Sequence, residues 1–333
     1  DQAKRKKQFR GVRKWLSESE ADVAVISSEF FASVKPPVLK EALDTHVPGE
    51  LYQDLRVIAS VRPHASRFLA AFMQRTKTGQ YFGDIDEFLA TLQKNEPLTF
   101  LYAKRFLRWL RRFGDLFVLK PFIRSELRGG DISEDFFHEV LEGAPFQVGE
   151  KVEANVSVTT KSLAGLRRMH ENFRDVGMDS KSRSLVGGAM GNHFLGAPAA
   201  GSEKPKLDRQ TAEGVIATFR KDAKDLDAAF FGQSLMLDDL DRCADKTRDG
   251  KMDLTADVHF SPDEIKSLDE LSKAVAADIR VYRRLWALHY HMNHRKVRNY
   301  MTPPAEALIK LKAAAKRVKA IDDRLYAIAE ILH

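Results

Sequence analysis

The stretch LRVIASVRPHASRFLAAFMQRTKTG, residues 55–79, decides the fold of this chain. Its β-branched run at 57–61 predicts a strand, which ends where Arg62 and Pro63 interrupt the pattern. The residues that follow predict an amphipathic helix over 65–77, because these apolar side chains recur at helical spacing: Phe68, Leu69, Phe72 and Met73. A strand followed at once by a helix is the elementary unit of an α/β fold.

Arg62 occupies the junction between this strand and this helix, where a bound anion would be stabilised. Free backbone N–H groups and the dipole at a helix N-terminus attract negative charge, and a guanidinium binds phosphate oxygens bidentately. The same residue is equally consistent with a solvated arginine in an ordinary turn. Both interpretations stay open at this point.

The first half of the chain alternates short apolar runs with amphipathic segments. Strands are predicted at 23–27, 55–61 and 116–120, and helices at 3–18, 65–77, 85–93, 97–113 and 133–143, the last beginning at Ser133. Short apolar strands separated by helices are typical of a parallel sheet covered on both faces. We therefore expect an α/β core over residues 1–206 and a helical C-terminal region over residues 207–333.

Several local signals mark where the later helices begin. Asp84 with Glu87, and Ser261 with Glu264, have the spacing of a capping box. The second pair begins a helix that should run at least to residue 286. The glycine- and serine-rich segment 177–206 predicts a loop or hinge, with residues 186–201 as a lid over a site.

The last predicted helix covers residues 305–331 and carries an apolar seam. Packing within the chain is the favoured interpretation of this seam, because Asp322 interrupts it. Packing on a partner helix, which would form an oligomer, is the alternative.

Cysteine content, apolar runs and net charge limit the compartment and the partners that we expect for this protein. The 333 residues include a single cysteine, Cys243, and no apolar run near the roughly 20 residues that span a bilayer. These features indicate a reducing compartment, and we expect a cytoplasmic location. The net charge of +7 is concentrated in residues 271–333. It suits an anionic partner, although the solvated faces of long helices explain it equally well.

Four further segments, taken together with residues 55–79, form a series that can be compared with known families. They are DVAVISSEFF at 22–31, LFVLKPFIRSELRGGDISEDFF at 116–137, NVSVTTKSL at 155–163 and FRKDAKDLDAAFFG at 219–232. In order and spacing the series resembles the bacterial sulfotransferase-like group of P-loop proteins, over roughly residues 20–175 and the last stretch. The resemblance implies a parallel sheet of P-loop type flanked by helices, with a helical C-terminal extension.

The resemblance also implies an activity and a set of donor contacts. Proteins of this group transfer a sulfuryl group from the nucleotide PAPS (3′-phosphoadenosine 5′-phosphosulfate) to a hydroxyl acceptor, often a carbohydrate, and no metal is expected. Arg62 matches the family arginine that binds the donor 3′-phosphate. Gln74 and Lys77, on the following helix, are expected to add polar contacts. Asn155 and Ser157 are expected nucleotide contacts.

Glu29 matches the family acid that serves as general base, taking the proton of the acceptor hydroxyl. Its alternative role is a carboxylate at a helix start, satisfied by nearby N–H groups. The chain departs from the family where Ala70 replaces the serine that usually assists the arginine. No glycine-rich, lysine-bearing donor loop is visible. We expect that loop in residues before Asp1, unless donor binding has been lost.

Two other functions stay open. A non-catalytic member of the same fold would bind an acidic glycan or a partner protein through basic helices at 101–113 and 280–319. A glycosyltransferase acting on envelope polysaccharide would bind a sugar nucleotide instead of PAPS. Nucleic acid is not the expected partner in any of the three. An amphipathic helix that covers the sheet explains the first basic segment without a ligand.

Two sequence patterns resemble metal-binding motifs only in part, and we do not expect either to bind a metal ion. Residues 245–256 partly fit a calcium loop, but Thr247 occupies its third position and Ala256 replaces the closing glutamate. His291 and His294 share one face of a predicted helix but lack further ligands, so packed or solvated histidines are the expected outcome.

Overall fold

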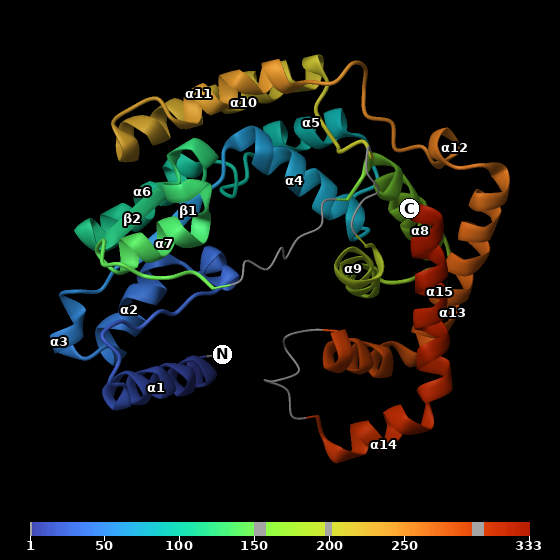
Figure 1. Cartoon of the computed structure of the whole chain (residues 1–333), viewed down its shortest axis with the longest axis horizontal. Coiled ribbons are helices and arrows are strands. Elements are labelled where there is room, and N and C mark those ends of the chain that lie inside the picture. The colour runs from blue at the N-terminus through green and yellow to red at the C-terminus, as the bar shows by residue number, and fades with distance from the viewer. Residues whose placement is uncertain (1, 150–157, 197–201, 295–302) are drawn as a thin grey trace. The chain divides into compact units, whose positions relative to one another are not determined.

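The segment that decides the fold forms one strand of a small parallel sheet. The computed structural model describes residues 2–149, 158–196, 202–294 and 303–333 (Figure 1). Within them, β1 (Val57–Val61) pairs in parallel with β2 (Phe117–Pro121), from Val57 opposite Phe117 to Val61 opposite Pro121. The Phe122 amide extends the pairing by donating to the Val61 carbonyl at 2.8 Å. Both strands and their parallel pairing were predicted from their apolar runs, and both are confirmed.

The strand predicted at 23–27 is wrong. These residues form no regular structure, and Val23, Val25 and Ile26 are 41%, 39% and 47% exposed. An apolar, β-branched run forms a strand only where a neighbouring strand and a covering layer bury it, and the described residues supply neither to residues 23–27. The described part of the chain is therefore mostly helical, with a two-stranded sheet.

Helices form most of the remaining described residues. The first half contains α1 (Gln2–Glu18), η1 (Glu29–Ser33), α2 (Pro36–His46), α3 (Gly49–Tyr52), α4 (His64–Lys77), α5 (Ile85–Asn95), α6 (Tyr102–Phe113), η2 (Gly114–Leu116), η3 (Arg124–Glu126), η4 (Arg128–Gly130) and α7 (Ile132–Val140). The second half contains α8 (Thr160–Asp175), α9 (Ser180–Ala189), η5 (Met190–Phe194), α10 (Arg209–Leu226), η6 (Asp227–Phe231), α11 (Met236–Asp241), η7 (Arg242–Lys246), α12 (Ala256–His259), α13 (Pro262–His294), α14 (Ala305–Ala313) and α15 (Ala315–Leu332). None of the helices in the described ranges combines the length and the apolar character that crossing a membrane requires.

The predicted capping boxes are confirmed. The Glu87 amide donates to the Asp84 carboxylate at 2.8 Å, and the Asp84 amide donates back to the Glu87 carboxylate at 3.2 Å. Ser261 and Glu264 make the same reciprocal pair at the start of α13. These contacts satisfy N–H groups that a helix start leaves without intrahelical partners, which explains why so short a pattern located both starts.

Two other predicted helix starts are wrong. The helix predicted from residue 97 begins at Tyr102, because the Pro97 carbonyl accepts the amides of Phe100 and Leu101 in a separate turn. The helix predicted from Ser133 begins one residue earlier. Its cap is Asp131, whose carboxylate accepts the amides of Ser133 and Glu134.

The loop predicted over 177–206, with a lid at 186–201, is wrong for residues 180–194. These form α9 and the single π-helical turn η5, while residues 197–201 lie outside the described part. Gly177, with φ of +80°, ends α8 in a Schellman motif, and the Asp179 carboxylate caps α9. Three of the glycines in this segment are helical instead, with Gly187 and Gly188 in α9 and Gly191 in η5.

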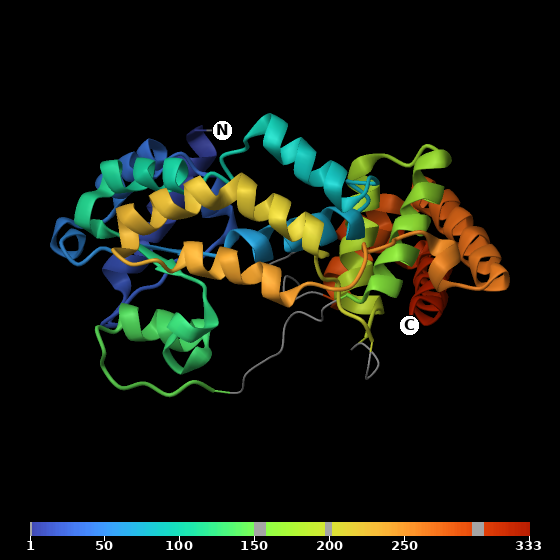
Figure 2. The same cartoon turned by 90° about the horizontal axis from the view of Figure 1, so that it is seen from above.

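The final helices pack within the chain, as the apolar seam predicted. α13 and α15 lie side by side in Figures 1 and 2. The predicted helix over 305–331 is divided at Ala314 into α14 and α15. On α15 the seam residues Val318, Leu325, Ala329 and Leu332 are buried. Leu308 on α14 is 38% exposed, so that end of the seam is not covered by the described residues.

Contacts between residues divide the chain into two compact units. Unit 1 comprises Asp1–Ser66, Gln93–Lys151 and Val215–Cys243, and unit 2 comprises Arg67–Leu92, Val152–Gly214 and Ala244–His333. The sheet belongs to unit 1, where the aromatic face of α6 covers β2 through Phe106 and Trp109 against Phe117. Both units are built from interleaved segments. They differ from the sequence-based division at residue 206, which stays a prediction.

Candidate anion-binding site

Arg62 is the first residue after β1, and Phe122 is the first residue after β2. The parallel register therefore brings them to the same edge of the sheet. The Arg62 guanidinium carbon lies 5.4 Å from the centroid of the Phe122 ring, within the range of a cation–π contact. Arg62 is exposed, and its guanidinium makes no hydrogen bond or ion pair with the described residues. The ring thus orients a cation whose hydrogen-bond donors face solvent.

His64 is fully buried two residues beyond Arg62, as the first residue of α4. Its ring contacts the rings of Tyr102 and Phe219, at centroid distances of 4.4 and 5.2 Å. Its Nε2 lies 2.9 Å from a carboxylate oxygen of Asp222 on α10. The turn that carries Arg62 is therefore followed at once by a buried and hydrogen-bonded side chain.

Asp222 joins three helices through residues that belong to unit 1. Besides His64, its carboxylate accepts the amides of Tyr102 at 2.7 Å and Ala103 at 3.1 Å, at the start of α6. The carboxylate replaces the missing side-chain cap of α6 and fixes the first turn of α4 against α10. Reasoning from the sequence missed this pair, because His64 and Asp222 are 158 positions apart and no local spacing connects them.

Lys120 lies at the same end of the sheet but is already paired. Its amine lies 2.9 Å from the Asp135 carboxylate and 3.1 Å from the Glu139 carboxylate, both on α7. Burial by itself would lower the Lys120 pKa, but the hydrogen bonds to these two carboxylates outweigh burial and raise the pKa. Lys120 therefore anchors α7 to β2 and is less suited than Arg62 to bind an anion.

Glu29 is exposed in the first turn of η1. It makes no hydrogen bond or ion pair with the described residues, and the strand expected just before it is absent. The structure shows no contact between Glu29 and Arg62, although both belong to unit 1. Its role as a base stays a prediction.

Gln74 and Lys77 lie near the end of α4, in unit 2. Gln74 is exposed. Lys77 is half-buried, burial lowers the pKa of its amine, and no carboxylate among the described residues pairs with it. A Cβ atom added to Gly191 would come within 2.6 Å of Lys77 Cδ, so this glycine makes room for the lysine. The expected contacts Asn155 and Ser157 lie outside the described residues.

A buried histidine holds the end of α4 in unit 2. The Nε2–H of His170, on α8, donates to the Lys77 carbonyl at 2.8 Å. His170 is completely buried, and burial lowers its pKa from 6.5 to about 4. The imidazole is therefore neutral at pH 7, with Nε2 as its donor nitrogen.

The weak metal motifs do not assemble a site in the described part of the chain. No group of three His, Cys, Asp or Glu side chains there is placed to hold an ion. His289 instead lies 2.9 Å from the Asp322 carboxylate, which also accepts the indole N–H of Trp286 at 2.8 Å. The acid that interrupts the seam of α15 thus bonds to α13.

Comparison of the chain with protein-family models, with curated proteins and with solved structures finds no match. Interpretation of the site therefore depends on its residues.

Proposed function

We propose that the edge of the sheet at Arg62 binds the 3′-phosphate of a nucleotide, and that the chain is a PAPS-dependent sulfotransferase of the P-loop type. The observation that carries this proposal is the exposed Arg62 guanidinium, oriented by Phe122 at the end of two parallel strands. The ends of parallel strands are where α/β folds bind ligands, and a guanidinium matches phosphate geometry. A cytoplasmic location and a bacterial origin belong to the same proposal.

In the proposed reaction an acceptor hydroxyl, most simply on a carbohydrate, attacks the sulfur of PAPS. A new O–S bond forms as the bond from sulfur to the 5′-phosphate oxygen breaks, and adenosine 3′,5′-bisphosphate leaves. A general base takes the hydroxyl proton, and exposed Glu29 is the candidate for this role. Arg62 binds the 3′-phosphate, which takes no part in bond breaking, so its contribution is to bind and orient the donor.

A second function is supported by the exposed face of α6. Lys104, Arg108 and Arg111 follow one another at helical spacing on that face, and the helix contains no acidic residue. A stripe of this kind attracts a polyanion such as an acidic glycan. In this alternative the chain is a non-catalytic binding protein.

Calorimetric titration with adenosine 3′,5′-bisphosphate tests the first proposal. We expect micromolar binding, which Arg62→Ala weakens by about 2 kcal/mol, or about thirtyfold, because a charge-assisted contact is lost. Arg56→Ala is the matched control. Arg56 is an exposed arginine just before β1, and its guanidinium donates to the carbonyls of Gln53 and Leu55.

The outcomes separate the competing proposals. No binding of the bisphosphate, or equal weakening by both arginine variants, would reject the site at Arg62. Binding of UDP-glucose in place of the bisphosphate would favour the glycosyltransferase alternative.

A further inference from the structure

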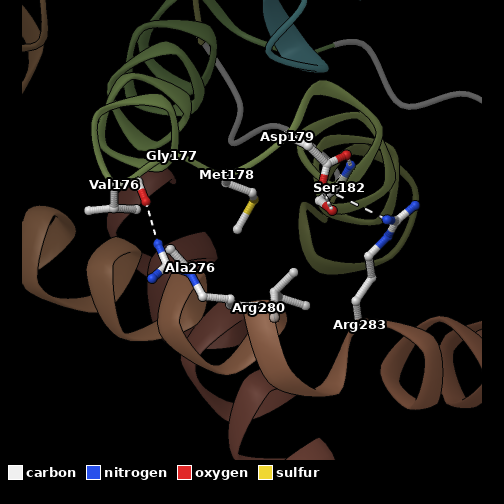
Figure 3. Close-up of a pocket in the computed structure, with 9 residues that line it drawn as sticks. Val176, Gly177, Met178, Asp179, Ser182, Ala276, Arg280 and Arg283 are labelled. Carbon is white, nitrogen blue, oxygen red and sulfur yellow. Dashed lines mark hydrogen bonds and ion pairs between the residues drawn. The ribbon is translucent and has the colours of Figure 1, made fainter.

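A pocket of about 190 Å³ lies in unit 2, where the turn between α8 and α9 meets α13 (Figure 3). Its lining combines apolar, basic and acidic side chains: Val176, Gly177, Met178, Asp179, Ser182, Ala276, Ile279, Arg280 and Arg283. None of these residues belongs to the candidate site at Arg62. The pocket therefore requires an explanation of its own.

The turn between α8 and α9 places the apolar side chains of Val176 and Met178 at the pocket. The Gly177 amide donates to the Arg174 carbonyl and the Met178 amide donates to the Phe173 carbonyl, both at 2.8 Å, which completes the Schellman motif. Met178 lies between α8 and α9 on the side that faces α13 (Figure 3). Ala276 and Ile279, one turn apart on α13, are buried and add further apolar surface.

Two arginines of α13 line the same pocket, and they differ in how far they are engaged. Arg280 donates to the Val176 carbonyl at 2.5 Å, so that carbonyl at the end of α8 fixes its position. Arg283 lies 3.8 Å from the Asp179 carboxylate, which is longer than a hydrogen bond. The Arg283 guanidinium therefore keeps donors that a ligand can use.

Asp179 does not satisfy Arg283, because its carboxylate is committed to the first turn of α9. It accepts the Ser182 hydroxyl at 2.5 Å and the amides of Lys181 and Ser182 at 3.0 Å. These hydrogen bonds, those from Ser182 above all, lower the pKa of Asp179. The N-terminus of α9 is thus already occupied, and Arg283, which faces Asp179 only as an ion pair at 3.8 Å, is the lining guanidinium without a hydrogen bond in the described part of the chain.

We propose that this pocket binds a small aromatic carboxylate, with its ring against Met178, Ala276 and Ile279 and its carboxylate on Arg283. An apolar protein cavity of about 150 Å³ admits one benzene ring, so the volume here suits a ring with a single small substituent. A guanidinium pairs bidentately with a carboxylate, which determines the charge of that substituent. The proposal is independent of nucleotide binding in unit 1.

The test uses the full chain labelled with ¹³C at its methionine methyl groups, with the Met178 signal assigned through Met178→Leu. On titration with benzoate we expect the Met178 signal to shift and saturate, with a dissociation constant on the order of 1 mM for so small a ligand. Benzamide, which has nearly the same shape without the charge, and inorganic phosphate, which has charge without the ring, are expected to bind at least about tenfold more weakly.

Arg283→Gln is expected to weaken benzoate binding by at least about tenfold, since it removes the charged donors. Arg284→Gln is the matched control, because Arg284 is the adjacent exposed arginine of α13 and does not line the pocket. The methyl signals of the other methionines report whether each variant keeps its fold. An unshifted Met178 signal, equal binding of benzamide or phosphate, or equal loss in the two arginine variants would overturn the proposal.

Discussion

At the residue scale, two buried histidines have the clearest consequences for the stability of this protein. His170 and His64 are both fully buried, and each has one ring nitrogen hydrogen-bonded and a buried Nδ1 without a partner in the described part of the chain. For His170, burial disfavours the charged imidazolium, because the added charge would lack solvent. Burial accordingly lowers the pKa of His170 to about 4.

This pKa predicts a loss of stability in mild acid. Between pH 6.5 and about 4 the unfolded chain binds a proton at His170 that the folded chain does not. The free energy of unfolding should therefore fall as pH decreases through that range, by about 1.4 kcal/mol per pH unit and about 3 kcal/mol in all. Urea unfolding at a series of pH values measures this change in the free energy of unfolding.

His170→Gln keeps a side-chain N–H donor but cannot titrate, so its stability should fall less steeply over the same range. His138→Gln, which removes a partly exposed histidine of α7, should keep the steep slope of the unsubstituted chain. Parallel slopes for the unsubstituted chain and His170→Gln would show that His170 is not the group responsible.

At the scale of elements, close helix packing explains one of the two glycines of α9. A Cβ atom at Gly187 would lie 2.3 Å from the Lys77 carbonyl oxygen and 2.7 Å from the imidazole of His170. A Cβ atom at Gly188 would meet nothing within 4 Å. Two adjacent glycines of one helix thus differ completely in what surrounds them.

Alanine substitutions at these two positions should have opposite effects. Gly188→Ala should stabilise the chain by up to about 1 kcal/mol, because alanine favours a helix interior over glycine. Gly187→Ala should destabilise it by about 1–3 kcal/mol, since the new methyl group clashes with the backbone of Lys77. Thermal unfolding measures the change in Tm of each variant relative to the unsubstituted chain. Equal shifts in Tm would contradict close packing at Gly187.

Some parts of the fold could be predicted from the sequence and others could not. β1, β2, α4 and the two capping boxes depend on neighbours within a few positions, so periodicity and spacing identified them. The failures depended on distant residues. Whether residues 23–27 form a strand is decided by burial against other segments, and whether Gly187 marks a loop or a helix contact is decided by Lys77 and His170.

The candidate site likewise contains residues that the sequence predicted and residues that it did not. Arg62 was identified because it ends a local strand pattern, and its position at the sheet edge is confirmed. Phe122, which orients it, and Asp222, which holds the turn through His64, are remote in sequence and were not identified. A single sequence carries no rule that links the histidine at the start of one helix to an acid in another helix 158 positions away.

At the scale of the whole molecule, the net charge of +7 attracts anions in general, so specific and general attraction must be separated. We compare Arg62→Ala with a variant that carries Lys104→Gln, Arg108→Gln and Arg111→Gln on the exposed face of α6. At 0.1 M salt the field of exposed charges is screened over about 10 Å. Adenosine 3′,5′-bisphosphate should therefore lose about thirtyfold in affinity with Arg62→Ala and less than about threefold with the α6 variant.

Dextran sulfate, an acidic glycan, should show the opposite order if α6 supplies the polyanion surface. Raising the salt to 1 M shortens the screening distance to about 3 Å, so binding of the polymer should weaken far more than binding of the bisphosphate at a defined contact. If the α6 variant instead loses the bisphosphate as completely as Arg62→Ala does, the nucleotide is held by general positive charge. The edge of the sheet would then have no specific role, and the non-catalytic alternative would be favoured.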